Sequence, residues 1–264
     1  MTRMRILRTL GVTTAVLAVT ASLAGCGSDD SKATSGNGEI SGTVTVFAAA
    51  SLTETFTKLG HDFEAAHPGT KVVYSFGASS ALAQQIKQGA PADVFASAAP
   101  ANMQQVVDSG DVTAHPDTFV SNRLEIAVPK GNPGKITGLA DFGKPDPRIA
   151  LCAVQVPCGA AAEQVFKISN ITPQPDTREQ DVKAVLTKVT LDEVDAALVY
   201  RTDVQAAGDK VEGIDFPESG KVINTYPIAP LAKAPNAAAA TAYVDYIHSD
   251  QAKKVFADAG FDTP

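Results

Sequence analysis

Small and hydroxyl-bearing residues stand together at three points where a strand-like segment of the sequence passes into a helix-like one. These points are residues 47–54 (Phe-Ala-Ala-Ala-Ser-Leu-Thr-Glu), 76–82 (Phe-Gly-Ala-Ser-Ser-Ala-Leu) and 156–159 (Val-Pro-Cys-Gly). Ser51 with Glu54 three residues later fits a capping box, which would bring a hydroxyl and free amides to a helix start. Helix N-termini attract anions through unpaired N–H groups and the helix dipole. Together the junctions predict an anion site, whereas each alone would fit an ordinary helix cap.

The predicted site contains no cationic side chain, since none of the three junctions holds Lys, Arg or His. A fully ionised oxyanion can still be held if N–H and O–H donors surround its oxygens. Charge-assisted hydrogen bonds contribute about 1.5–3 kcal/mol each. About six of them can reach micromolar affinity, about −8 kcal/mol. A donor-only site also rejects protonated anions, because the O–H of such an anion would face another donor.

The remaining pattern alternates strand-like and helix-like segments. The first half predicts strands at 43–47, 71–76 and 93–97 and helices at 52–66, 80–88 and 101–108. The second half predicts strands at 123–129, 148–153, 195–200 and 222–229 and helices at 160–168, 181–189, 236–247 and 250–259. This alternation implies an α/β fold with mainly parallel sheets. Ligands of such sheets bind beyond the carboxyl ends of the strands, where the three junctions would lie.

Residues 1–25 have the pattern of a secretory signal peptide. Arg3, Arg5 and Arg8 give a basic start, and the apolar run of residues 9–23 is shorter than the ~20 residues that span a bilayer. The run ends in Leu-Ala-Gly-Cys26, which resembles the lipobox of bacterial lipoproteins, whose cysteine is lipidated. Residues 26–42, rich in Ser, Gly, Asp and Asn, predict a flexible lipid-anchored tether. We expect export and anchoring to the outer face of the cell membrane; an ordinary signal peptide is the alternative.

The charge of the chain restricts its partners. Loss of residues 1–25 removes three positive charges and no negative ones, and so changes the formal net charge from −7 to −10. An acidic exterior argues against a nucleic-acid partner. It also gives an anion no long-range attraction, so an anion site must be built from local donors.

Two cysteines remain beside Cys26. Cys152 and Cys158 are six residues apart in a chain predicted to be exported into an oxidising setting. The hypothesis is a disulfide that closes a short loop, and the alternative is two free thiols.

Several stretches resemble the periplasmic molybdate-binding proteins of ABC importers. The similarity runs from Thr43 to Phe261, and it is carried by residues 44–52, 75–83, 89–97, 197–203 and 243–246. The resemblance implies a two-lobed binding-protein fold of type II, each lobe a mainly parallel sheet flanked by helices. The lobes are expected at residues 43–121 plus 226–264 and at residues 122–225. An anion bound between them would favour the closed state of a hinge.

The resemblance also implies a set of ligand-binding residues. Ser51 and Ser79 should donate hydroxyl and backbone N–H bonds from the first lobe, and Cys158 and Val182 should donate backbone N–H bonds from the second. Tyr200 should direct its hydroxyl at a ligand oxygen. The family often has alanine where Cys158 stands and a serine-rich run at residues 77–78. A backbone donor tolerates the new side chain, although a disulfide could alter the local geometry.

The sequence thus predicts an exported binding lipoprotein that captures molybdate or tungstate and delivers it to the permease and ATPase of an ABC importer. We expect a monomer without cofactor, with molybdenum bound only as molybdate and no catalytic residues. The four histidines lack metal-ligand spacing, and Asp93 and Asp203 are expected to bond backbone groups. The alternatives are another tetrahedral oxyanion such as sulfate, a scaffold with an unused cleft, and a serine hydrolase using Ser51 or Ser79. The hydrolase lacks a Gly-x-Ser-x-Gly elbow.

Overall fold

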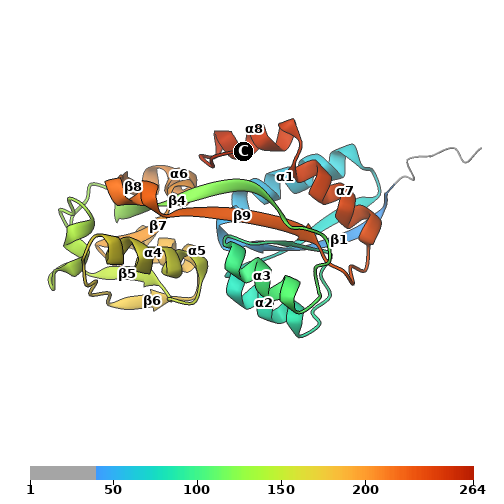
Figure 1. Cartoon of the computed structure of the whole chain (residues 1–264). Helices are drawn as coiled ribbons and strands as arrows, with labels where there is room; N and C mark the ends of the chain where they lie inside the picture. Colours follow the sequence, from blue (N-terminus) through green and yellow to red (C-terminus); the bar gives the residue numbers. More distant parts are fainter. Residues whose placement is uncertain (1–39) are drawn as a thin grey trace, which may run out of the picture. The chain divides into compact units, whose positions relative to one another are not determined.

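The computed structural model describes residues 40–264 (Figure 1). The predicted signal peptide (residues 1–25), Cys26 and the tether as far as residue 39 lie outside the described residues, so the structure does not address those predictions. Within residues 40–264, no helix combines the length and the apolar composition needed to cross a membrane.

Nine strands join into one sheet in the order β2-β1-β3-β9-β4-β7-β5-β6, with β8 paired to β4. Their bounds are β1 (Gly42–Ala49), β2 (Thr70–Gly77), β3 (Val94–Ala96), β4 (Asp117–Pro129), β5 (Ile149–Cys152), β6 (Thr177–Glu179), β7 (Ala196–Tyr200), β8 (Val211–Ile214) and β9 (Ile223–Pro230). The pairs β1–β2, β1–β3, β5–β6 and β5–β7 are parallel, whereas every pair made by β4 or β9 is antiparallel.

The sheet is accompanied by α-helices and short 3-10 turns. The α-helices are α1 (Thr53–Ala66), α2 (Ser79–Lys87), α3 (Pro100–Asp108), α4 (Pro157–Ile168), α5 (Val182–Thr190), α6 (Arg201–Ala207), α7 (Ala237–Ile247) and α8 (Asp250–Asp258). The 3-10 turns are η1 (Ala50–Leu52), η2 (Leu139–Gly143), η3 (Gly208–Lys210) and η4 (Pro217–Lys221).

Apolar side chains separate into cores on the two sides of the molecule. On one side, alternation along β1 sends Val46 toward α1, α7 and α8 and Phe47 toward α2 and α3, because neighbouring residues of a strand face opposite sides of the sheet. The other core is built from residues between Leu124 and Val222, with Ala50 added from the first side. Each core has its own helices and strands, and the chain therefore has the predicted two-lobed α/β fold.

Strands β4 and β9 run side by side from one lobe to the other (Figure 1). The first part of β4 pairs with β9 as far as Arg123, and from Leu124 onward β4 pairs with β7 and then β8. This exchange of partners lies next to the crossing expected near residues 121–122. The lobe boundaries themselves, 43–121 plus 226–264 and 122–225, stay a prediction, because the sheet continues without a break through the exchange.

The structure adds elements that the sequence pattern did not predict. Strand β4 begins at Asp117 and not near residue 123, because its first residues are paired by β9. Helix α6 follows β7 without an intervening loop, and β6 and β8 are short strands of three and four residues. Pairing with a distant strand stabilises such segments, and a local pattern does not contain that information.

Glu125 lies on β4 just beyond the exchange of partners, and burial raises its pKa to about 7, with a further increase from Asp215 that Arg201 and Arg123 oppose. The folded state therefore holds this proton more tightly than the unfolded state. Stability should fall as the pH rises from about 4.5 to about 7 and should then level off.

We therefore expect Glu125→Gln to raise the melting temperature at pH 8 and to change it little near pH 4, where the wild-type carboxyl is protonated in both states. Thermal unfolding across this pH range measures the effect, with Asp209→Asn as a matched change of an exposed carboxylate. A stabilisation that is the same at both pH values would contradict the assignment.

Candidate functional site

The five residues expected to bind a ligand line a single cavity. The empty space in and in front of this cavity amounts to about 220 Å³, part of which is open solvent. Its lining residues are Ala49, Ala50, Ser51, Gly77, Ala78, Ser79, Ala98, Val156, Pro157, Cys158, Asp181, Val182 and Tyr200. All three junctions singled out in the sequence contribute to it. Ser51 and Tyr200 are 149 positions apart in the chain, and the order of the strands brings them together.

Three helices begin at this cavity. Ser79 is the first residue of α2, Cys158 the second residue of α4, and Val182 the first residue of α5. Amides in the first turn of a helix have no partner within the helix, and the dipole gives this end a partial positive charge. The first backbone bond of α4 comes from the N–H of Ala160, so the N–H of Cys158 precedes it. Three positive helix ends thus converge on one small space.

Ser79 and Ser51 are both buried and both have their oxygen bonded within the first lobe. The Oγ of Ser79 accepts the N–H of Ala98 at 2.9 Å, so the hydroxyl proton of Ser79 is free to be donated elsewhere. The Oγ of Ser51 lies 2.9 Å from the hydroxyl of Tyr226. Both serines line the cavity, and each can present a hydroxyl donor to it.

The predicted capping box of Ser51 and Glu54 is wrong. Ser51 lies inside the 3-10 turn η1, and α1 begins after Leu52 without a side-chain cap. The carboxylate of Glu54 accepts hydrogen bonds from Lys183 at 2.8 and 2.9 Å instead. Ser51 and Glu54 therefore do not bond each other's helix start. Ser51 bonds Tyr226 on β9, and Glu54 bonds Lys183 on α5.

Tyr200 closes the cavity from the carboxyl end of β7. Its side chain is 1% exposed, and its hydroxyl makes no hydrogen bond of normal geometry within residues 40–264, although Tyr226 and Asn224 lie near enough to act on its pKa. Burial raises the pKa of Tyr200 well above its ordinary value, and Tyr226 and Asp203 add to the increase. The hydroxyl therefore keeps its proton and is available as a donor. A buried hydroxyl without a partner costs about 1–3 kcal/mol, which a ligand oxygen could offset.

Charged groups near the cavity are already engaged with one another. Asp203 accepts the backbone N–H of Tyr200 at 3.1 Å, as expected of a backbone-bonding carboxylate, and its other oxygen lies 3.0 Å from the ammonium group of Lys183. Burial acts to lower the pKa of Lys183, but Asp203 and Glu54 outweigh it and raise the pKa, so the lysine stays charged. Lys183 is thus balanced by two carboxylates and does not line the cavity.

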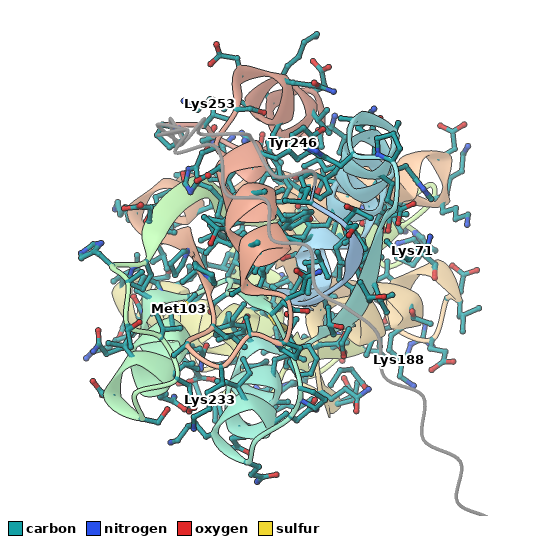
Figure 2. All side chains as sticks on the ribbon, turned by 90° about the vertical axis from the view of Figure 1, so that its right-hand side faces the viewer. Lys71, Met103, Lys188, Lys233, Tyr246 and Lys253 are labelled. Carbon is teal, nitrogen blue, oxygen red and sulfur yellow. A yellow bond between two sulfur atoms is a disulfide. The ribbon has the colours of Figure 1, made fainter. Side chains whose placement is uncertain are left out.

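Asp181 is the charged residue that does line the cavity. Its Oδ1 accepts the N–H of Ala184 at 2.9 Å and so caps α5. This bond turns one carboxylate oxygen onto the helix. The lining residues include no Lys, Arg or His. Figure 2 shows Lys71 and Lys233 at the outside of the molecule, and both are exposed. The hydroxyl and amide groups that line the cavity are therefore uncharged, and their role as ligand donors stays a prediction.

The loop between β5 and α4 is closed by a disulfide in the structure, between Cys152 and Cys158. Gly159 permits this arrangement. A Cβ at residue 159 would collide with the carbonyl oxygen of Ala153 and would lie 2.9 Å from that of Cys152. The start of α4 can therefore approach the strand end closely, and the amide of Cys158 reaches the cavity.

Several residues near the cavity were not predicted from the sequence. Tyr226 contacts Ser51, Lys183 joins Glu54 to Asp203, and Asn224 donates to the carbonyl of Ala98 at 3.0 Å. Tyr226 and Asn224 belong to β9, which carries no junction-like motif. Of these residues, only Lys183 could have been placed near the site from the sequence, because it follows the predicted binding residue Val182 at the start of α5.

The geometry agrees with comparisons to known proteins. A family model described as bacterial extracellular solute-binding protein matches residues 44–262. The chain belongs to this family. The molybdate-binding protein ModA of Mycobacterium tuberculosis is 37% identical to this chain, over 98% of this chain and 100% of its own length. ModA of Escherichia coli is 33% identical over 83% of this chain and 89% of its own.

A solved structure supports the fold of this solute-binding protein. The periplasmic molybdate-binding protein of Azotobacter vinelandii superposes with a TM-score of 0.73 at 20% identity, and the match covers 84% of this chain and 99% of the other. The family model and the relatives of 33–37% identity confirm the membership among solute-binding proteins that the stretches at residues 44–52, 75–83 and 89–97 predicted.

Replacing Gly159 by alanine should displace the start of α4, which carries Cys158. Because the new Cβ would meet the backbone of Ala153, α4 must shift, and we expect a loss of about 1–3 kcal/mol in the free energy of unfolding. Urea denaturation measures this loss. Gly220→Ala is the control, since a Cβ there meets nothing within 4 Å. Equal stability of the two variants would show that the close approach of α4 is not required.

Proposed function

We propose that this protein captures a doubly charged tetrahedral oxyanion, molybdate and also tungstate, in the cavity and delivers it to the permease and ATPase of an ABC importer. The proposal is supported by the uncharged donors around the cavity and by relatives named as molybdate-binding proteins. It assigns the protein a transport role and not a catalytic one. It requires no cofactor, and molybdenum is bound only as its oxyanion.

The buried hydroxyl of Tyr200 carries the proposal. A phenol that is 1% exposed and makes no hydrogen bond of normal geometry within residues 40–264 is unfavourable on its own. It lines the same cavity as the starts of α2, α4 and α5, where partial positive charge gathers. An acceptor with several oxygens and negative charge would satisfy the hydroxyl and the helix ends together.

Each predicted residue then has a distinct role. Ser51 and Ser79 donate hydroxyl protons, and their backbone N–H groups add further donors. Cys158 and Val182 donate only from the backbone, so their side chains are free to pack: both are buried in the second core. Tyr200 donates its phenolic proton. The donors come from several separate segments, and the ligand must fit all of them at once.

Binding between the lobes would act on a hinge. Ser51 and Ser79 belong to the lobe expected at residues 43–121 plus 226–264, and Cys158, Val182 and Tyr200 to the lobe expected at residues 122–225. Strands β4 and β9 connect the two sides. An anion that accepts bonds from both sides favours the closed arrangement by those bonds, and the closed form is what the permease would recognise.

We further propose that the protein acts outside the cytoplasm as a monomer held to the membrane by lipid on Cys26. The basic start, the apolar run and the Leu-Ala-Gly-Cys26 sequence support this anchor. One multiply acylated cysteine holds a protein stably at a membrane.

A serine hydrolase and a sulfate carrier are the competing functions. No histidine lines the cavity, and the hydrogen bonds of the two serines go to the amide of Ala98 and the hydroxyl of Tyr226 and not to a basic side chain that could activate a nucleophile. Sulfate has the charge of molybdate but is smaller, and parallel titration separates the two.

Calorimetry with molybdate, tungstate, sulfate and phosphate tests the proposed ligand. Ser79→Ala, Ser51→Ala and Tyr200→Phe should each weaken molybdate binding by about 1–3 kcal/mol, because each removes one donor to a charged acceptor. Ser109→Ala, an exposed change far from the cavity lining, should leave binding unchanged. Unchanged affinity in all three cavity variants would exclude this site.

We also propose that the disulfide between Cys152 and Cys158 forms in the exported protein, as it does in the structure. Mass spectrometry of the unreduced protein should then find no alkylatable thiol in residues 40–264. Reduction should weaken anion binding, because the amide of Cys158 lies at the end of the closed loop. Two alkylated cysteines before reduction would contradict the proposal.

A further inference from the structure

Tyr226 stands directly behind one of the cavity donors. It belongs to β9, is 0% exposed, and places its hydroxyl 2.9 Å from the Oγ of Ser51. Its ring is held edge-on against Phe119, Phe261 and Tyr200, with ring centres 6.4, 5.7 and 6.1 Å apart. The phenol is therefore fixed in position, and it does not itself line the cavity.

One hydrogen bond joins these two hydroxyls, and either the proton of Tyr226 or the proton of Ser51 can make it, so the direction of the bond matters. A phenol is a better donor and a poorer acceptor than an aliphatic hydroxyl, and burial raises the pKa of Tyr226, so it keeps its proton. Its hydroxyl lies at hydrogen-bond distance from Ser51, and Asn122 and Tyr200 are neighbours that act on its pKa as donors and so compete little for its proton. Tyr226 therefore donates to Ser51, and the proton of Ser51 is left to point into the cavity.

The hydroxyl proton of Ser79 is also left free to point into the cavity, but for a different reason. Its Oγ accepts a backbone N–H from Ala98, and an amide donor cannot reverse its direction. The bond between Ser51 and Tyr226 can reverse, because both groups are able to donate. Whether Ser51 acts as a donor or as an acceptor toward the cavity thus depends on the side chain of Tyr226.

We propose that Tyr226 is a specificity-determining residue that fixes Ser51 as a donor and so excludes oxyanions that carry a proton. This inference rests on the proposed function of oxyanion capture. Without the phenol, Ser51 is free to turn its lone pair toward the cavity and accept a hydrogen bond from an O–H of the ligand. Selection against protonated anions of equal charge is then reduced.

Sulfate and hydrogen phosphate are the probes that isolate this effect. Both are tetrahedral, similar in size and doubly negative, but only hydrogen phosphate carries a proton. Asp181 also lines the cavity and carries acceptor oxygens, but it is the same in every variant compared. A change in the ratio of the two affinities therefore reports the direction of the Ser51 hydroxyl.

The experiment is competition calorimetry at pH 8 against bound molybdate, using wild type, Tyr226→Phe, Ser51→Ala and the double variant. We expect Tyr226→Phe to weaken molybdate binding on the order of tenfold and to narrow the preference for sulfate over hydrogen phosphate by a similar factor. In the Ser51→Ala background, Tyr226→Phe should change neither quantity, because its effect passes through Ser51.

Tyr243→Phe is the matched control. Tyr243 is also 0% exposed, and its hydroxyl bonds Tyr74 at 2.9 Å in the core of the first lobe, away from the cavity. This variant should leave the anion ratio at the wild-type value whatever it does to stability. The inference would be overturned if Tyr226→Phe left the ratio of sulfate to hydrogen phosphate affinity at the wild-type value. It would also be overturned if Tyr226→Phe changed this ratio equally in the wild-type and Ser51→Ala backgrounds. Wild type that binds none of the anions would instead overturn the proposed function, and the inference with it.

Discussion

The first amides of a helix have no partner within the helix, and in this protein three such helix starts open on one cavity. The constraint is geometric: α2, α4 and α5 must each begin at the same place, although they follow different strands. Each start alone offers a weak partial charge that solvent would screen. Their convergence in a mostly buried space, together with the phenol of Tyr200, makes an anion the natural occupant.

The sheet supplies that convergence. Parallel strands end at a common edge, and β1, β2, β5 and β7 each lead into a segment that lines the cavity or carries a residue that does. Strands β4 and β9 connect the two sides through antiparallel pairing, and their residues near Asn122 and Asn224 pair directly. The same two strands thus position the lobes and bring Tyr226 behind Ser51.

Charge is arranged around the cavity without entering it as a free cation. Lys183 links Glu54 on α1 to Asp203 at the start of α6, so its ammonium group is neutralised where it lies. The ligand would therefore meet dipoles and hydroxyl protons and not a point charge. Such a site depends on the direction of each hydroxyl, which is why the partners of Ser51 and Ser79 matter as much as the serines.

The sequence by itself determined the alternating α/β elements, the family, and the three junctions that line the cavity, because strand period, helix spacing and small residues at a helix start are local properties. It failed where a distant segment competed. Glu54 bonds Lys183 and not the start of α1, Ser51 bonds Tyr226 at 175 residues' separation, and the first half of β4 forms on β9. Only the tertiary structure decided these partners, since a polar group bonds the donors and acceptors that the fold brings within about 3 Å.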